Sequence, residues 1–261
     1  MKRKDCFFGL HFDFHANENT ENIGERFDPK ILEKIMGMVK PDFVQCDTKG
    51  HPGYSSYPTN VGNRAKNISR DILKEWRRVT REKGVLLYAH HSGLWDMKAT
   101  KDHPEWAAED KDEKLTDRAS VFGDYADKLL IPQLKELAED YGLDGAWIDG
   151  ECWAIIPDYC EKATEAYFKK TGKKAKDIET EEETREYLDF NRAAFIDYVR
   201  HYVSEVKKSC PDFEVASNWF CSSWMPDAVE VTDFLSGDMQ PRNSVIDNLR
   251  FDCRALESFG R

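Results

Sequence analysis

Short apolar segments alternate with helical segments along most of the chain, and this alternation constrains the fold more than any other feature. Six segments have the length and composition of buried strands, and most connections between them show the 3.6-residue apolar period of a helix. Successive strands joined by helical crossovers pair in parallel. The predicted strands span residues 6–15, 42–47, 85–90, 144–149, 213–218 and 232–237.

The predicted helices carry recognisable end signals. Asp28 and Pro29 begin a helix that runs to about Val39, and Ser69 is expected to cap a second helix that ends at Gly84. Further helices are predicted at about 125–141, in two or three pieces between 156 and 208 with a break at 171–174, and at about 244–259. The acidic run 181–183 indicates a solvated helix start.

Parallel βα units build either an open sheet or a barrel. No GxGxxG or P-loop follows the first strand, so the sequence lacks the motif that would indicate a nucleotide-binding open sheet. Polar, aromatic-rich segments instead follow the strands, where a (β/α)8 barrel builds its active site. We therefore predict that residues 1–261 form a single TIM-barrel domain. Only six of eight strands are found, so the barrel is expected to lack its last one or two βα units at the C-terminus, or to close with a partner or in a non-standard way.

Charge and composition exclude several classes of partner. The 261 residues carry 38 basic and 49 acidic side chains, a net charge of −11, which argues against nucleic-acid binding. No apolar run approaches the roughly 18–20 residues of a membrane span. His11 and Asp13 interrupt the apolar start too early for a signal peptide, and the seven cysteines form no CxxC pair. We expect a cytoplasmic protein with reduced thiols, no cofactor and no membrane partner; a homo-oligomer stays open.

The fourth predicted strand carries the sharpest chemical signal. Trp147, Asp149 and Glu151 are spaced two apart, so they are expected to point to one side of the strand end. An acid there either caps the next segment or serves as a nucleophile or acid/base facing a pocket. Asp238, after the sixth predicted strand, could be a second catalytic carboxylate, and Glu151 competes for that role. Glycosidases need two such groups, about 5–5.5 Å apart for retention or roughly 6.5–9.5 Å for inversion.

Histidines of the first and third strands point to two chemistries. His11, Asp13 and His15 share one strand face, which raises the possibility of a metal site, but the fifth and sixth predicted strands contain no further histidine. Our main expectation is therefore no metal, with His11 binding a sugar hydroxyl or hydrogen-bonded in the core. His90 and His91 are adjacent, so only one of them should reach a pocket.

Tryptophans are concentrated in the segments that follow strands. Aromatic faces pack on the C–H surfaces of sugars, which would suit this placement, although the same rings could simply plug the loops. Trp76 instead fits a helix core. The tryptophans after strands are Trp95, Trp106, Trp153, Trp219 and Trp224.

Three stretches are similar to the motifs of one enzyme family. Residues 42–58 resemble YVVLTxKHHDGFxLWP, residues 70–90 resemble RDIVxEL…GLKFGxYYS, and residues 131–150 resemble QLxELLxxYGxIDxxWFDG. The chain thus resembles the α-L-fucosidases of glycoside hydrolase family 29 and the wider fucosidase-like barrel glycosidases. The likeness covers roughly residues 7–150, and residues 215–238 look more like uncharacterised glycosidases of the same superfamily.

The resemblance implies roles for individual residues. It assigns the nucleophile to Asp149, a sugar-binding histidine to His11, and the second histidine of KHHDGF to His51. Gly50 and Pro52 depart from that motif, replacing its first histidine and its aspartate. The first strand reads HFDF where fucosidases read IHWG.

These observations lead to one main hypothesis, a retaining, exo-acting glycoside hydrolase of α-L-fucosidase type. Asp149 would attack the anomeric carbon, and Asp238 or Glu151 would protonate the leaving oxygen. Two alternatives remain: a non-catalytic carbohydrate-binding barrel, and a metal-dependent hydrolase using His11 and His15. The expected substrate-binding residues are His11, Asp13, His51, His90, His91, Trp95, Trp147, Asn218 and Trp219.

Overall fold

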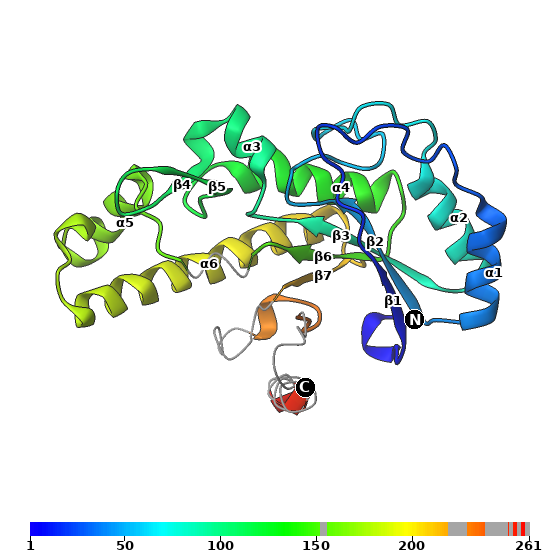
Figure 1. The fold of residues 1–261 in the computed structure, drawn as a ribbon. Coiled ribbons are helices and arrows are strands. Elements are labelled where there is room, and N and C mark those ends of the chain that lie inside the picture. Colours follow the sequence, from blue (N-terminus) through cyan, green and yellow to red (C-terminus); the bar gives the residue numbers. More distant parts are fainter. Residues whose placement is uncertain (152–155, 219–228, 238–249, 251–252, 255–256, 259–261) are drawn as a thin grey trace.

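A parallel five-stranded sheet forms the centre of the computed structural model (Figure 1), which describes residues 1–151, 156–218, 229–237, 250, 253–254 and 257–258. The strand order follows the sequence without reversal, as in a barrel and unlike a doubly wound sheet. Five of the predicted strands are confirmed within a few residues. They are β1 (Gly9–Phe12), β2 (Phe43–Lys49), β3 (Leu86–Ser92), β6 (Gly145–Asp149) and β7 (Glu214–Ser217).

The sixth predicted strand, residues 232–237, is wrong as a strand. Ser236 makes a single parallel bridge to Asn218 beside β7. The carboxylate of Asp233 accepts the Val215 N–H at 2.8 Å, while the Asp233 N–H donates to the Val215 carbonyl at 2.9 Å. The Asp233 carboxylate thus accepts a backbone N–H that would otherwise pair with a neighbouring strand. The described residues therefore form a sheet of five parallel strands rather than a closed barrel.

The first two helices pack against the sheet on one flank (Figure 1). Asp28 caps α1 (Pro29–Val39) by accepting the Lys30 N–H at 2.9 Å, as predicted. Helix α2 (Ile72–Lys83) ends at Gly84 with φ of 68°, also as predicted.

The predicted cap of α2 was wrong by two residues. Asp71, not Ser69, accepts the N–H of Lys74, at 3.2 Å. Ser69 instead donates its backbone N–H to the Ile23 carbonyl at 2.9 Å, which holds it in an extended segment before the helix.

Later helices follow the predicted pattern. A π-helical turn, η3 (Ala126–Leu130), leads into α4 (Ile131–Glu139). The break predicted at 171–174 separates α5 (Glu161–Thr171) from the long α6 (Glu181–Ser209), whose start is fixed by a capping box between Thr180 and Glu183. The helix predicted at 244–259 falls largely outside the described residues. The short 3-10 turns are η1 (Arg3–Asp5), η2 (Pro104–Trp106), η5 (Ala175–Asp177) and η6 (Val229–Val231).

A hairpin lies where only a long loop was expected. After α3 (Met97–Asp102), strands β4 (Ala107–Glu109) and β5 (Leu115–Ala119) pair antiparallel. Their turn is held by Asp110, whose Oδ1 accepts two backbone N–H groups. Strands this short, with charged residues between and within them, carry little apolar periodicity, so sequence patterning missed them.

The two faces of the sheet differ in character. One face is apolar and packs against the helices; the other presents polar and aromatic side chains. Alternation along each strand produces this division, so residues near the C-terminal ends of neighbouring strands gather on one polar surface. The apolar face includes Val44, Leu87, Ala146, Ile148 and Val215.

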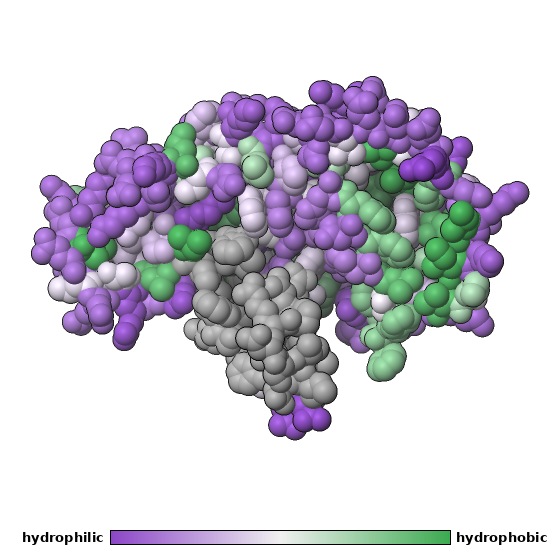
Figure 2. Space-filling model, in the orientation of Figure 1, coloured by the Kyte–Doolittle hydropathy of each residue, from purple (hydrophilic) through white to green (hydrophobic). Residues whose placement is uncertain are grey.

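The face of the molecule shown in Figure 2 is mainly hydrophilic, with apolar side chains gathered over α1. Ile31, Met38 and Val39 of this helix are exposed. Among the described helices, none is both long and apolar enough to cross a membrane. The described cysteines carry free thiols, as predicted.

A fully buried ion pair ties β2 to the segment after β3. Lys49 Nζ donates to Asp96 Oδ2 at 2.7 Å, to the Tyr125 hydroxyl at 3.0 Å and to Gln133 Oε1 at 3.2 Å. Asp96 also caps α3 by accepting the Ala99 N–H at 2.9 Å. The charge of Lys49 is therefore balanced inside the protein by one carboxylate.

Replacing Asp96 by asparagine should destabilise the fold strongly. The amide keeps a capping oxygen but leaves the Lys49 ammonium buried without its counter-charge, so we expect a loss of about 3–5 kcal/mol in the free energy of unfolding by urea. Asp102→Asn removes an exposed pairing with Lys98 and should cost less than about 1 kcal/mol. Equal losses in the two variants would contradict this account.

Candidate active site

Asp149 ends β6 on the polar face of the sheet, where three other segments supply polar side chains to its carboxylate. Asn218 Nδ2 donates to Oδ1 at 2.7 Å, and His90 Nε2 donates to Oδ2 at 3.2 Å. His51 Nε2 lies 3.4 Å from Oδ2. Burial alone would raise the pKa of Asp149, but opposing effects, of which the hydrogen bonds from His90 and Asn218 are the largest, hold the pKa well below its usual range. The carboxylate is therefore ionised, and its side chain is still 12% exposed.

The hydrogen bonds of His51 determine which ring nitrogen carries its proton. Ser92 Oγ donates to the Trp95 carbonyl at 2.6 Å, so its single proton is used there. His51 Nδ1, 2.7 Å from Ser92 Oγ, must then be the donor to that oxygen. Burial lowers the pKa of His51, which favours the neutral ring. Its Nε2 then presents a lone pair beside Asp149 and can accept a hydrogen bond from a hydroxyl group.

An aromatic group forms the surface next to Asp149. The ring centroids of His11 and His90 are 4.9 Å apart, and the Trp147 ring lies 5.8 Å from His11 and 5.2 Å from His90. Trp147 pairs in register with His90, two positions before Ser92 pairs with Asp149. Trp147 and Asp149 thus share a face, as predicted, and His11 joins them.

Glu151 does not share that face, contrary to the expectation from its spacing. Gly150 has φ of 71°, which breaks the alternation of the strand. Ser217 and Asn218 are adjacent and point to opposite faces: Asn218 contacts Asp149, whereas the Ser217 hydroxyl donates to Glu151. The Tyr202 hydroxyl of α6 also donates to Glu151, at 2.9 Å. Glu151 is fully buried on the helix side, and burial raises its pKa to about 8.

The two adjacent histidines of β3 separate as predicted. His90 reaches the polar face. His91 is fully buried on the other side, with Nδ1 2.9 Å from Thr48 Oγ1 and Nε2 3.2 Å from Gln133 Oε1. His91 therefore helps to hold the sheet to the helices and lies on the opposite face of the sheet from Asp149.

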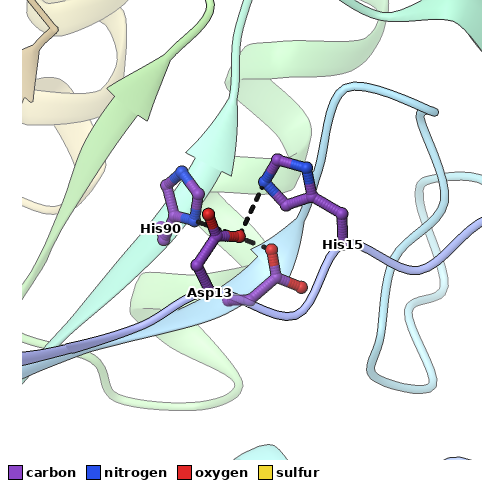
Figure 3. A group of neighbouring side chains, drawn as sticks. Asp13, His15 and His90 are labelled. Carbon is purple, nitrogen blue, oxygen red and sulfur yellow. Dashed lines mark ion pairs between the residues drawn. The ribbon is translucent and has the colours of Figure 1, made fainter. Parts of the chain in front are cut away.

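Three further groups, Asp13, His15 and Asp47, meet beside His90. Asp13 lies between His15 and His90 (Figure 3), and Asp47 Oδ1 is 3.7 Å from His90 Nδ1. Burial raises the pKa of Asp47 to about 7, against the opposing effect of His90. Sequence reasoning missed Asp47, although it carries the same signal as Asp149, an acid near the C-terminal end of a buried strand. The ligand atoms of these four residues lie within 4.8 Å of one another, so they could hold a metal ion.

Trp95 links this surface to a cavity. Its ring stacks on His51, with centroids 4.4 Å apart and planes 9° apart. Trp95 also lines a cavity of about 440 Å³ between the β4–β5 hairpin and residues 156–159. Arg118 of β5 forms one wall by donating to the carbonyls of Ile156 and Pro157, and Tyr159 contributes a second aromatic side chain.

Most of the predicted site residues come together. Two of them, Asp238 and Trp219, lie outside the described residues, as do Trp153 and Trp224. Glu151 and His91 face the helices. The residues that share the polar surface around Asp149 are His11, Asp13, His51, His90, Trp95, Trp147 and Asn218.

The raised pKa of Glu151 predicts a pH-dependent stability. Its ordinary value is 4.5, so between pH 4.5 and 8 the folded state keeps a proton that the unfolded chain releases. Stability contributed by this group is therefore lost as pH rises through that window. Glu151→Gln removes the effect, so its stability relative to the unmodified protein should increase from pH 5 to pH 8, by up to about 1.4 kcal/mol per pH unit.

Urea denaturation followed by tryptophan fluorescence at four pH values measures this difference. Glu165→Gln, at an exposed position of α5, is the matched control and should run parallel to the unmodified protein. A constant difference between Glu151→Gln and the unmodified protein at all four pH values would refute the prediction.

Solved structures share this fold. The α-L-fucosidase isoenzyme 2 from Paenibacillus thiaminolyticus superposes with a TM-score of 0.68 at 21% identity, over 82% of this chain and 32% of that one. A β-galactosidase from Bacillus circulans sp. alkalophilus gives 0.68 at 11% identity, over 100% and 44%. The PgaB (BpsB) glycoside hydrolase domain from Bordetella bronchiseptica gives 0.69 at 14%, over 97% and 80%. The chain thus spans less than half the length of the first two.

A family comparison is more specific. No curated protein matches the chain. The family model described as Alpha-L-fucosidase, however, matches residues 3–249, which is nearly the whole sequence. The chain therefore belongs to the α-L-fucosidase family.

Proposed function

We propose that the protein is a retaining, exo-acting glycoside hydrolase of α-L-fucosidase type, with Asp149 as its nucleophile. The observation that carries the proposal is the state of Asp149: an ionised, partly accessible carboxylate at the C-terminal end of a parallel strand, held by Asn218 and His90. That end of the strands is where barrel enzymes place their catalytic groups. The sequential parallel order of the sheet supports completion of the barrel by further strands.

In the proposed reaction, a carboxylate oxygen of Asp149 forms a bond to the anomeric carbon as the bond to the leaving oxygen breaks. A second carboxyl group protonates that oxygen and later takes a proton from the water that hydrolyses the glycosyl ester. The depressed pKa keeps Asp149 ionised at neutral pH, because its neutral form lacks the stabilisation given by His90 and Asn218.

The second carboxylate is assigned to Asp238, with Glu151 as the alternative. Glu151 holds its proton at neutral pH, as a general acid must. Its carboxyl group, however, is fully buried and bonded to Tyr202 and Ser217 on the helix side of the sheet. A carboxyl in that position would have to leave both partners to reach a leaving group, which favours Asp238.

The substrate is proposed to be the terminal sugar of a carbohydrate. A sugar hydroxyl can donate its proton to the lone pair of His51 Nε2, which lies 3.4 Å from the Asp149 carboxylate. His11 and Trp147 supply ring surface on one side. The cavity beside Trp95, with Tyr159 and Arg118, has room for the rest of the glycoside.

Removing the nucleophile should abolish turnover of aryl glycosides. Asp149→Gly is expected to reduce the rate on 4-nitrophenyl α-L-fucoside, or on the most active aryl glycoside of a panel, by at least about 10³-fold. Azide can occupy the vacated space and attack the anomeric carbon, giving a glycosyl azide of inverted configuration. Asp140→Gly, at the exposed end of α4, should retain the rate.

Proton NMR of the product formed first by the unmodified enzyme should show the anomer of the substrate. An inverted first product would exclude retention, and an Asp149→Gly rate equal to that of Asp140→Gly would exclude Asp149 as nucleophile. Sugar binding without turnover of any aryl glycoside would favour the carbohydrate-binding alternative.

The acid/base assignment has its own test. Asp238→Ala should slow glycosides with poor leaving groups far more than activated aryl glycosides, because only the former need a proton on the leaving oxygen. Azide should rescue it with retained configuration, opposite to Asp149→Gly. If Glu151→Gln shows this behaviour and Asp238→Ala does not, the two roles must be exchanged.

A further inference from the structure

Two carboxylates and two imidazoles converge beside the proposed nucleophile (Figure 3). Asp13 comes from the segment after β1, together with His15, while Asp47 lies on β2 and His90 on β3. One nitrogen or oxygen from each residue lies within 4.8 Å of all the others. Three separate segments of the chain thus direct metal-ligating atoms at one point.

A buried carboxylate in this group lacks a hydrogen-bond donor among the described residues. The side chain of Asp47 is 0% exposed, and neither of its oxygens has a hydrogen-bond partner in that part of the chain. His90 Nδ1, which faces it, is also buried and makes no hydrogen bond to a described residue. Burying a carboxylate without donors is costly, and polar groups left in this way call for an ion or water among them.

The separations suit coordination of a single ion. His15 Nε2 is 2.8 Å from Asp13 Oδ1, and His90 Nδ1 is 3.6 Å from Asp13 Oδ1 and 3.7 Å from Asp47 Oδ1. Metal–ligand bonds of about 2.0–2.2 Å place neighbouring ligand atoms roughly 3.0–3.5 Å apart. All four ligand atoms lie within 4.8 Å of one another, so side-chain rotations that shift some of them by roughly 1 Å would bring all four into one coordination sphere.

The proton on His90 is already in the right place for this role. Its Nε2 donates to Asp149 Oδ2, which leaves Nδ1 to present a lone pair to an ion. Metal-binding histidines usually donate their other N–H to a carboxylate or carbonyl in this way. Asp149 would thus orient a ligand while keeping its own hydrogen bond.

The backbone leaves space for the second histidine. A Cβ atom on Gly50 would lie 2.3 Å from the His15 ring, so only glycine allows the ring to sit there. Asp13 also falls in the HFDF segment that differs from the IHWG motif, and His15 follows it directly.

We propose that Asp13, His15, Asp47 and His90 bind one divalent transition-metal cation such as Zn²⁺ or Mn²⁺. Two carboxylates balance its charge, and the mixture of imidazole and carboxylate ligands favours these ions over Mg²⁺ or Ca²⁺. This inference departs from the sequence expectation of no metal, uses a different ligand set from the His11/His15 alternative, and does not rest on the proposed function.

The test uses the full chain with any affinity tag removed and with metal stripped by a chelator. Calorimetric titration with Zn²⁺, Mn²⁺ and Mg²⁺ separately, and elemental analysis after gel filtration, give affinity and stoichiometry. We expect one equivalent of Zn²⁺ or Mn²⁺, with Mg²⁺ binding at least 100-fold more weakly. Asp47→Asn and His15→Ala should each weaken binding at least tenfold, whereas His201→Ala should not.

His201 is a matched control because its Nε2 lies 2.7 Å from Asp127 Oδ1 in an exposed histidine–aspartate pair outside the group. No uptake by the unmodified protein would overturn the proposal, as would unchanged affinity in Asp47→Asn or His15→Ala, or an equal loss in His201→Ala. Circular dichroism checks folding, and two independent ligand variants keep the test decisive if one fails to fold. Metal binding without glycoside turnover would leave this site standing and remove the proposed function instead.

Discussion

A carboxylate kept inside a protein depends on the donors around it, and the polar face of this sheet is organised around that requirement at Asp149. Asn218 reaches it from the position directly after β7 and His90 from β3, and His51 approaches from the segment after β2. Because parallel strands end at one edge, residues separated by more than a hundred positions become neighbours there. Their hydrogen bonds keep the carboxylate ionised, so its protonation state depends on residues from several strands at this edge of the sheet.

The backbone conformation at Gly150 puts the carboxyl groups of Asp149 and Glu151 on opposite faces of the sheet. The left-handed conformation at Gly150 sends the second carboxyl to the helix side, where Tyr202 and Ser217 leave it mostly desolvated. Their pKa values move in opposite directions for that reason, one well below its ordinary range and the other up to about 8. Divergent environments for nearby carboxyls are a recurring feature of enzymes that need a base and an acid at one pH.

Much of this arrangement was predictable from local pattern. Short-range sequence patterns predict the succession of strands along the chain, the helix start at Pro29, the helix end at Gly84 and the separation of His90 from His91. The face of Glu151 was not predictable, because alternation assumes an unbroken strand. Asp47 ends a predicted strand as Asp149 does, but the groups that gather around it, Asp13 and His90, come from the segment after β1 and from β3, which local pattern does not bring together. Residues 232–237 were wrongly predicted as a strand because the Asp233 side chain accepts a backbone N–H that a neighbouring strand would otherwise bind.

The contact between Gly50 and His15 has a consequence for how such a sequence can change. The motif of the family places a histidine at position 50, but here the ring at position 15 occupies that volume. Any side chain at 50 would collide with it, so the two positions are epistatic: residue 15 must become small before residue 50 can become large. A change from this sequence toward the family motif is therefore tolerated only if residue 15 is substituted before residue 50.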